Sequence, residues 1–169
     1  MRKIELNELN DNVFDLIDKE WMLVCAGNRE QYNMMTVSWG GLGILWNKPV
    51  AFVFVRPERH TFGLLESNEL MSLSFLGNSQ QMRKIYQFCG SKSGKNVDKM
   101  KESGLTPTLS PQGAVCFEQS RLTIVGRKLY AQSLSEEAFA DKALTSFYGE
   151  KGGMHKMYIV EIEGAYVAE

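Results

Sequence analysis

The sequence has few of the residues on which hydrolytic and metal-dependent sites depend. Its two histidines, His60 and His155, stand in no HExxH, GxSxG or Cys–His pattern. The three cysteines, Cys25, Cys89 and Cys116, form no CxxC pair, and any disulfide scheme leaves one thiol over. No His or Cys occurs at metal-ligand spacing, so we predict no metal site. Any reactivity should therefore come from a bound cofactor.

The chain also lacks an excess of charge and a long hydrophobic run. It has 19 basic and 20 acidic residues, for a formal net charge of −1, which gives no electrostatic reason to bind nucleic acid or an anionic membrane. No apolar run is long enough to span a bilayer, and the N-terminus has no apolar signal-peptide region. Free thiols are typical of a reducing compartment. We therefore expect a cytoplasmic protein with neither nucleic-acid nor membrane partners.

What is present predicts one ordinary globular domain over residues 1–169. Apolar residues make up 44% of the chain and charged residues 23%, and this length can bury a sizeable core. Apolar runs with alternation predict strands at 21–27, 32–39, 50–55, 71–75, 115–133 (two strands joined near Gly126) and 154–167.

Helical patterns and turn residues lie between these strands. Caps and periodicity predict helices at 11–19, 60–67, 79–88, 97–103 (capped by Asn96 and closed by Gly104) and 136–148. Turns or bends are expected at 40–43, 46–49, 77–79, 89–96 and 150–153. Helices thus interrupt the strands without a regular βαβ alternation, which favours a mainly β fold: an antiparallel barrel with helical insertions.

The segment from Arg56 to Thr61 is a candidate phosphate site. Thr61 is expected at a helix N-cap, where free backbone N–H groups and the helix dipole attract anions. Arg56 and Arg59 add planar guanidinium groups that match phosphate oxygens. The alternative is that both arginines pair with surface carboxylates and Thr61 only caps the helix.

The segment from Asn33 to Trp39 is a candidate site for a flat ring. The end of a strand offers backbone donors and acceptors, and the small hydroxyl side chains of Thr36 and Ser38 allow a close approach. Trp39 or Trp46 could cover a ring face. The alternative is a hairpin strand that leads into a glycine-rich turn. Taken together, the two segments suggest a nucleotide-like cofactor with a ring at one end and a phosphate at the other, and FMN is the leading candidate.

The loop at residues 89–96 combines glycines, hydroxyls and lysines. Such a loop can form an anion-binding nest of backbone N–H groups. It is not a P-loop, because the spacing from Gly90 to Gly94 is one residue too short and Asn96 replaces the final hydroxyl residue. A surface turn without a ligand is the alternative.

Six segments together resemble the flavin reductase-like family of FMN-binding split-barrel proteins, including its flavoredoxin-type members. The resemblance spans roughly residues 20 to 165, and the order and spacing of its segments carry it. These segments are Tyr32–Gly40, Leu45–Pro49, Val55–Phe62, Leu73–Phe75, Ser93–Met100 (similar to the family's Ser-Gly-x-x-x-Asp-Lys segment) and His155–Ile162.

The resemblance implies a Greek-key split barrel, a homodimer and one FMN per subunit near the dimer interface. Carried over by position, residues of the first segment would meet the isoalloxazine ring, with Trp39 near its rim, and residues of the second would hold the phosphate. The implied cofactor-binding residues are Asn33, Met35, Thr36, Val37, Ser38 and Trp39 for the first segment, Arg56, Arg59 and Thr61 for the second, and Ser91, Ser93 and Lys99 further on.

The resemblance also implies an activity. Reductases of the family take hydride from NADH or NADPH at the flavin and pass electrons to free flavin or another acceptor. His155 falls where some members place a residue on the nicotinamide side. One alternative is a flavoredoxin-like electron carrier that a partner protein reduces. Another is a cofactor-free binding module whose arginines form only surface ion pairs.

Overall fold

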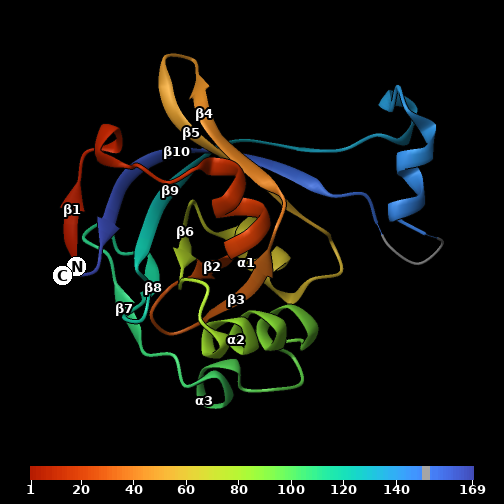
Figure 1. The fold of residues 1–169 in the computed structure, drawn as a ribbon. Coiled ribbons are helices and arrows are strands. Elements are labelled where there is room, and N and C mark those ends of the chain that lie inside the picture. Colours follow the sequence, from red (N-terminus) through yellow and green to blue (C-terminus); the bar gives the residue numbers. More distant parts are fainter. Residues whose placement is uncertain (150–152) are drawn as a thin grey trace.

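One large antiparallel sheet runs through the protein in the computed structural model, which describes residues 1–149 and 153–169 (Figure 1). The strand order is β3-β2-β6-β9-β10-β5-β4, with β1 paired to β10. The strands are β1 (Arg2–Ile4), β2 (Met22–Gly27), β3 (Tyr32–Val37), β4 (Gly40–Leu45), β5 (Lys48–Val55), β6 (Leu70–Phe75), β9 (Leu122–Ser133) and β10 (Lys156–Val167); β7 (Pro107–Leu109) and β8 (Val115–Phe117) form a separate two-stranded ribbon.

The sheet around β2 is covered on both faces, which explains why this strand is apolar along its length. On one face, Leu65 of helix α1 (His60–Ser67) packs with Phe75 and Tyr158 in the larger core cluster. On the other face, Tyr86 of helix α2 (Gln80–Ser91) packs with Phe117 of β8. Strands buried on both sides are expected to be apolar throughout. No helix in the described part of the chain is long and apolar enough to cross a membrane.

Three strands, β1, β4 and β7, were not expected from the sequence. The prediction of a bent connection at residues 40–43 is wrong, because Gly40–Leu45 pairs along its whole length with β5. A Cβ added at Gly40 would lie 2.5 Å from the Phe52 carbonyl oxygen, so this glycine allows β4 to approach β5 closely. The turn predicted at 46–49 is confirmed at its centre: Trp46 and Asn47 have φ angles of 54° and 57°, as a tight hairpin turn requires.

Gly126 does not separate two strands, contrary to the prediction. It lies within the continuous strand β9, and the break falls earlier, between β8 and β9. A Cβ at Gly126 would approach Val160 Cγ2 to 2.9 Å. The glycine therefore allows a close approach of β9 and β10, near a shift in their register at Ile159/Val160.

The predicted helix at 60–67 is confirmed as α1 (His60–Ser67), but its N-cap is Arg59 rather than Thr61. Thr61 lies in the first turn with its side chain fully buried. The sequence pattern misplaced the cap because a hydroxyl in a first turn can equally serve a tertiary contact.

The next two helices differ from prediction at their ends. Ser79 caps α2 (Gln80–Ser91) as expected, but the helix continues to Ser91 because Cys89 is buried against the core. The predicted loop at 89–96 is therefore helical in its first turn. Asp98, not Asn96, caps α3 (Lys99–Ser103): its carboxylate accepts two backbone N–H groups at 3.1 Å. Gly104 closes this helix in the left-handed region, as predicted.

The two remaining segments predicted as helices form other types of helix, one wider and one tighter than an α-helix. Residues 11–19 were expected to form an α-helix, but the chain forms a π-helical segment, Asp15–Glu20, preceded by the 3₁₀ turn Leu6–Glu8. Residues 136–148 form two 3₁₀ segments, η3 (Glu136–Ala138) and η4 (Lys142–Phe147). We call residues 134–149 the arm, because they project away from the sheet (Figure 1). The first three residues of the turn predicted at 150–153 lie outside the described residues.

Candidate functional site

Two adjoining hollows lie along β3, the end of β5 and the start of α1. The first, which we call the polar hollow, has a cavity volume of about 190 Å³. It is lined by Asn33, Met35, Arg56, Glu58, Arg59, His60, Thr61, Cys89, Ser91, Lys92, Ser93, Gly94 and Lys99.

The second, which we call the aromatic hollow, has a cavity volume of about 310 Å³ and shares three residues with the first. All twelve residues that the sequence singled out line one hollow or both. Their role in binding stays a prediction. The lining of the aromatic hollow is Met35, Thr36, Val37, Ser38, Trp39, Phe54, Arg56, Arg59 and His155.

Three of the predicted residues are already engaged with the protein itself. The Asn33 amide donates to the hydroxyl of Thr61 at 2.7 Å, and both side chains are buried. The Lys99 ammonium donates to the carbonyl oxygens of Met34 and Cys89, each at 2.8 Å. Burial lowers the pKa of Lys99. These contacts hold α1, α2 and α3 against β3, so Asn33, Thr61 and Lys99 shape the polar hollow from beneath.

Gly94 was not predicted as a site residue, and its position in the polar hollow depends on having no side chain. A Cβ there would lie 2.2 Å from Asn33 Oδ1 and 3.1 Å from His60 Cδ2. The sequence could have indicated Gly94, because it follows Ser93 in the segment that resembles the family's Ser-Gly-x-x-x-Asp-Lys pattern.

The charges around the polar hollow suit an anion. Arg56, Arg59, Lys92 and Lys99 outnumber the single carboxylate, Glu58. Arg59 uses one N–H to bind the Gly90 carbonyl at 3.0 Å, which leaves the rest of its guanidinium group for a ligand.

The start of α1 adds backbone donors to this hollow. Arg59 offers no side-chain acceptor to the helix. The first-turn N–H groups at His60 and Thr61 therefore stay available, as at other helix N-termini that bind anions.

The alternative, that Arg56 and Arg59 only form ion pairs with surface carboxylates, holds at most for Arg56. Arg56 meets Glu58 at 3.9 Å, which is a weak pair. Within residues 1–149 and 153–169, Arg59 has no carboxylate partner. The arginines are thus not consumed by surface carboxylates.

The aromatic hollow is more open than the polar one. Trp39 is 47% exposed, and its ring centroid lies 5.3 Å from that of His155. The Thr36 hydroxyl donates to the Tyr86 carbonyl at 2.6 Å, so this hydroxyl is already satisfied. Trp46, the other candidate to cover a ring, lies at the tip of the β4–β5 hairpin against Tyr130 and does not line either hollow.

The arm packs against residues that line the aromatic hollow, a contact that the sequence did not predict. Arg56 Nη2 donates to the Phe147 carbonyl at 2.7 Å, and its guanidinium carbon lies 5.2 Å from the centre of the Tyr148 ring. The Tyr148 hydroxyl is hydrogen bonded to His155 Nδ1 at 2.9 Å. Burial, and secondarily the charge of Arg56, lower the pKa of His155, which favours a neutral imidazole at neutral pH.

Phe54 and the arm residues were missed for different reasons. Phe54 could have been found from the alternation of β5, which turns it away from Val53 and Val55. Phe147 and Tyr148 reach the site only through tertiary packing. No cluster of three or more His, Cys, Asp or Glu side chains suited to a metal ion occurs among the described residues.

A family model for the flavin reductase-like domain matches residues 15–169. The chain belongs to the flavin reductase-like family. This confirms the resemblance seen in the sequence. Among curated proteins, no match to the chain is found.

Solved structures share the fold over nearly the whole chain. An FMN-binding protein from Thermus thermophilus is 19% identical, with a TM-score of 0.69, over 99% of this chain and 80% of that one. A flavoredoxin from Methanosarcina acetivorans is 21% identical, with a TM-score of 0.68, over 100% and 77%. An NADH:FAD oxidoreductase from Streptomyces globisporus C-1027 is 15% identical, with a TM-score of 0.64, over 88% and 74%.

The predicted fold class, a mainly β antiparallel split barrel, is confirmed. The structural neighbours have this fold, and the strand order explains the split. The sheet ends at β3 on one side and at β4 on the other, and these two edges do not pair with each other among the described residues. The barrel is therefore open beside the two hollows, both of which β3 lines.

Proposed function

We propose that this flavin reductase-like protein binds FMN across the two hollows and transfers hydride from NADH or NADPH to flavin. The observation that carries the proposal is the adjacency of a cationic polar hollow and an open aromatic hollow, joined by Met35, Arg56 and Arg59. A phosphate and a flat ring on one ligand match such a pair.

The residues present fit the phosphate of FMN. Guanidinium forks, lysine ammonium groups and the N-terminus of α1 converge on the polar hollow, and these are the donors that phosphate groups prefer in proteins. Of the predicted residues, Arg56, Arg59, Ser91 and Ser93 would contact the phosphate directly. Asn33, Thr61 and Lys99 would hold the hollow in shape.

The aromatic hollow fits the ring. The edge of β3 from Met35 to Ser38 offers backbone groups to a ring edge, and Trp39 and Phe54 offer apolar surface to a ring face. When bound, FMN would supply the hydride-accepting and electron-donating chemistry. Trp39 would keep water from one side of the ring. His155, held by Tyr148, would offer a neutral imidazole to a nicotinamide amide at the open side.

We also propose that the protein acts as a homodimer. Phe147 of the arm is 57% exposed and stands edge-on to Trp39, which is also exposed. A second copy that covers this edge would bury both side chains and close the aromatic hollow. The expected mass in solution is about twice 19.1 kDa; a monomer with bound FMN would contradict this assembly.

A second candidate function is a flavoredoxin-like electron carrier. The open aromatic hollow favours it, because a redox partner protein could reach a ring held there. In this case the flavin would be loaded but would not react with pyridine nucleotides.

Absorbance spectroscopy of the purified protein tests both proposals. The reductase predicts a yellow protein whose flavin band bleaches rapidly, under anaerobic conditions, on addition of NADH or NADPH. A yellow protein that neither nucleotide bleaches would instead support the carrier. A colourless protein that gains no thermal stability from added FMN would rule out both.

A further inference from the structure

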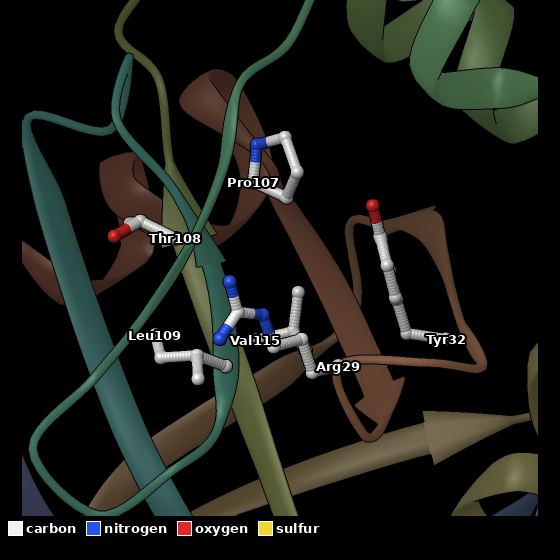
Figure 2. Close-up of a pocket in the computed structure, with 6 residues that line it drawn as sticks. All are labelled: Arg29, Tyr32, Pro107, Thr108, Leu109 and Val115. Atoms are coloured by element: carbon white, nitrogen blue, oxygen red, sulfur yellow. The ribbon is translucent and has the colours of Figure 1, made fainter.

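A third hollow opens on the other side of β3 and belongs to neither part of the candidate flavin site (Figure 2). Neighbouring side chains of a strand point to opposite faces, so Tyr32 faces this hollow while Asn33 lines the polar one. Its cavity volume is about 490 Å³, which is in the range of small-molecule sites. It is lined by Arg29, Tyr32, Pro107, Thr108, Leu109 and Val115.

Arg29 is set apart from the other arginines by its lack of a partner. Among the described residues, its guanidinium makes no hydrogen bond or ion pair, whereas every other arginine makes at least one. Those contacts are Arg2 with Glu8, Arg56 with Phe147, Arg59 with Gly90, Arg83 with Asn78, Arg121 with Glu20 and Arg127 with Glu163. A free planar fork at the wall of a hollow is suited to a carboxylate.

Tyr32 supplies a second donor to the same hollow. Figure 2 shows its hydroxyl at the end near Pro107 and the Arg29 guanidinium directed toward Leu109 and Val115, so the exposed Arg29 side chain must turn toward Tyr32 for both to reach one carboxylate. Burial raises the pKa of the Tyr32 phenol, with smaller contributions from Cys25 and Asp98, so the hydroxyl stays protonated and can donate. Asp98 directs its carboxylate to the backbone of α3. The negative charge of Asp98 near Tyr32 disfavours a doubly charged ligand such as a phosphate monoester. A single guanidinium group would also balance only one of the two charges of such a ligand.

The opposite wall is apolar. Pro107 and Leu109 come from β7 and the buried Val115 from β8. These three residues form one wall of the hollow and the Tyr32 ring forms the facing wall, so a flat apolar group fits between them.

We propose that this hollow binds a small aromatic carboxylate. The aromatic ring lies between Tyr32 and the apolar wall of β7 and β8, and the carboxylate accepts hydrogen bonds from Arg29 and Tyr32. The site is separate from the proposed flavin site and does not depend on the function proposed above.

Calorimetric titration of the purified protein with benzoate tests the proposal, with benzamide as the neutral isostere. Benzoate that occupied the polar hollow instead would bind Arg29→Met as tightly as the wild-type protein, because Arg29 lines only the third hollow. Benzoate should bind saturably at one site and at least tenfold more tightly than benzamide. Arg29→Met should weaken benzoate binding about tenfold, and Tyr32→Phe by a smaller factor, because each removes one donor.

The control is Arg2→Met, which removes an exposed arginine outside the hollow and should leave benzoate binding unchanged. Arg29 is exposed in a turn, so its variant should fold, and an unchanged melting temperature checks this. Equal affinities for benzoate and benzamide would overturn the proposal. So would wild-type benzoate affinity in Arg29→Met.

Discussion

The polar and aromatic hollows share two arginines but are built in opposite ways. In the polar hollow, Thr61 and Lys99 are buried and bonded to the protein, with Lys99 only 5% exposed. At the aromatic hollow, Trp39 and the adjacent Phe147 of the arm are largely exposed, and the arm is connected by the hydrogen bonds Arg56–Phe147 and Tyr148–His155. Buried polar groups must be satisfied within the protein, so the polar end is preorganised. The open aromatic hollow can admit a second reactant beside a bound ring. We infer that the polar hollow sets the affinity for FMN and that the aromatic hollow sets the access of the second reactant to the ring.

The largest effect should come from removing both arginines that join the hollows. Arg56→Ala with Arg59→Ala should weaken FMN binding by more than about 100-fold, because two charge-assisted interactions of about 1.5–3 kcal/mol each are lost. Quenching of FMN fluorescence on titration measures the affinity. The control is Arg29→Ala, in the turn between β2 and β3 and outside both hollows, which should bind FMN normally. Wild-type affinity in the double variant would support the cofactor-free alternative.

The next effect tests the preorganisation of the polar hollow. Lys99→Met should lower the free energy of unfolding by about 2 kcal/mol, because two buried carbonyl oxygens lose their donor. Urea denaturation measures it. Lys101→Met, an exposed change in the same helix, should have no measurable effect. If both variants unfold at the same urea concentration, Lys99 does not hold α2 and β3 together.

A smaller effect is expected at the aromatic hollow. Trp39→Ala should weaken FMN binding about fivefold, since an aromatic contact contributes about 1 kcal/mol, and should leave the unfolding free energy nearly unchanged. Trp46→Ala, at the hairpin tip, is the matched control and should alter neither quantity. A loss of stability in Trp39→Ala as large as that in Lys99→Met would remove the contrast between the two hollows.

The smallest effect concerns pH. The pKa of His155 is lowered from its ordinary value of 6.5, so the unfolded chain binds more protons than the folded chain in this range. Stability should therefore fall as the pH decreases through 6.5 and should level off below the folded pKa. His155→Gln should lessen this acid loss in urea denaturation at pH 7.5 and pH 5. An unaltered pH dependence in His155→Gln would show that His155 is equally solvated in both states.

Much of the barrel could be predicted from short-range patterns. The strands around Val24, Val53, Leu73 and Val160 were found because apolar runs with β-branched residues report burial directly. Gly40 and Gly126 misled the prediction. A glycine that allows a close approach to the Phe52 carbonyl or to Val160 looks the same in the sequence as a glycine that bends the chain.

The sequence by itself determined the family, the strand pattern and the two segments that approach a common site. These depend on periodicity, on helix starts and on the order of motifs, which all act over a few residues. Only the tertiary structure decided which residues are ligand candidates and which are supports. Asn33 meets Thr61 across 28 positions, Lys99 meets Met34 across 65, and Arg56 meets Phe147 across 91. Contacts at such separations arise when the sheet and helices pack, and no local pattern encodes them.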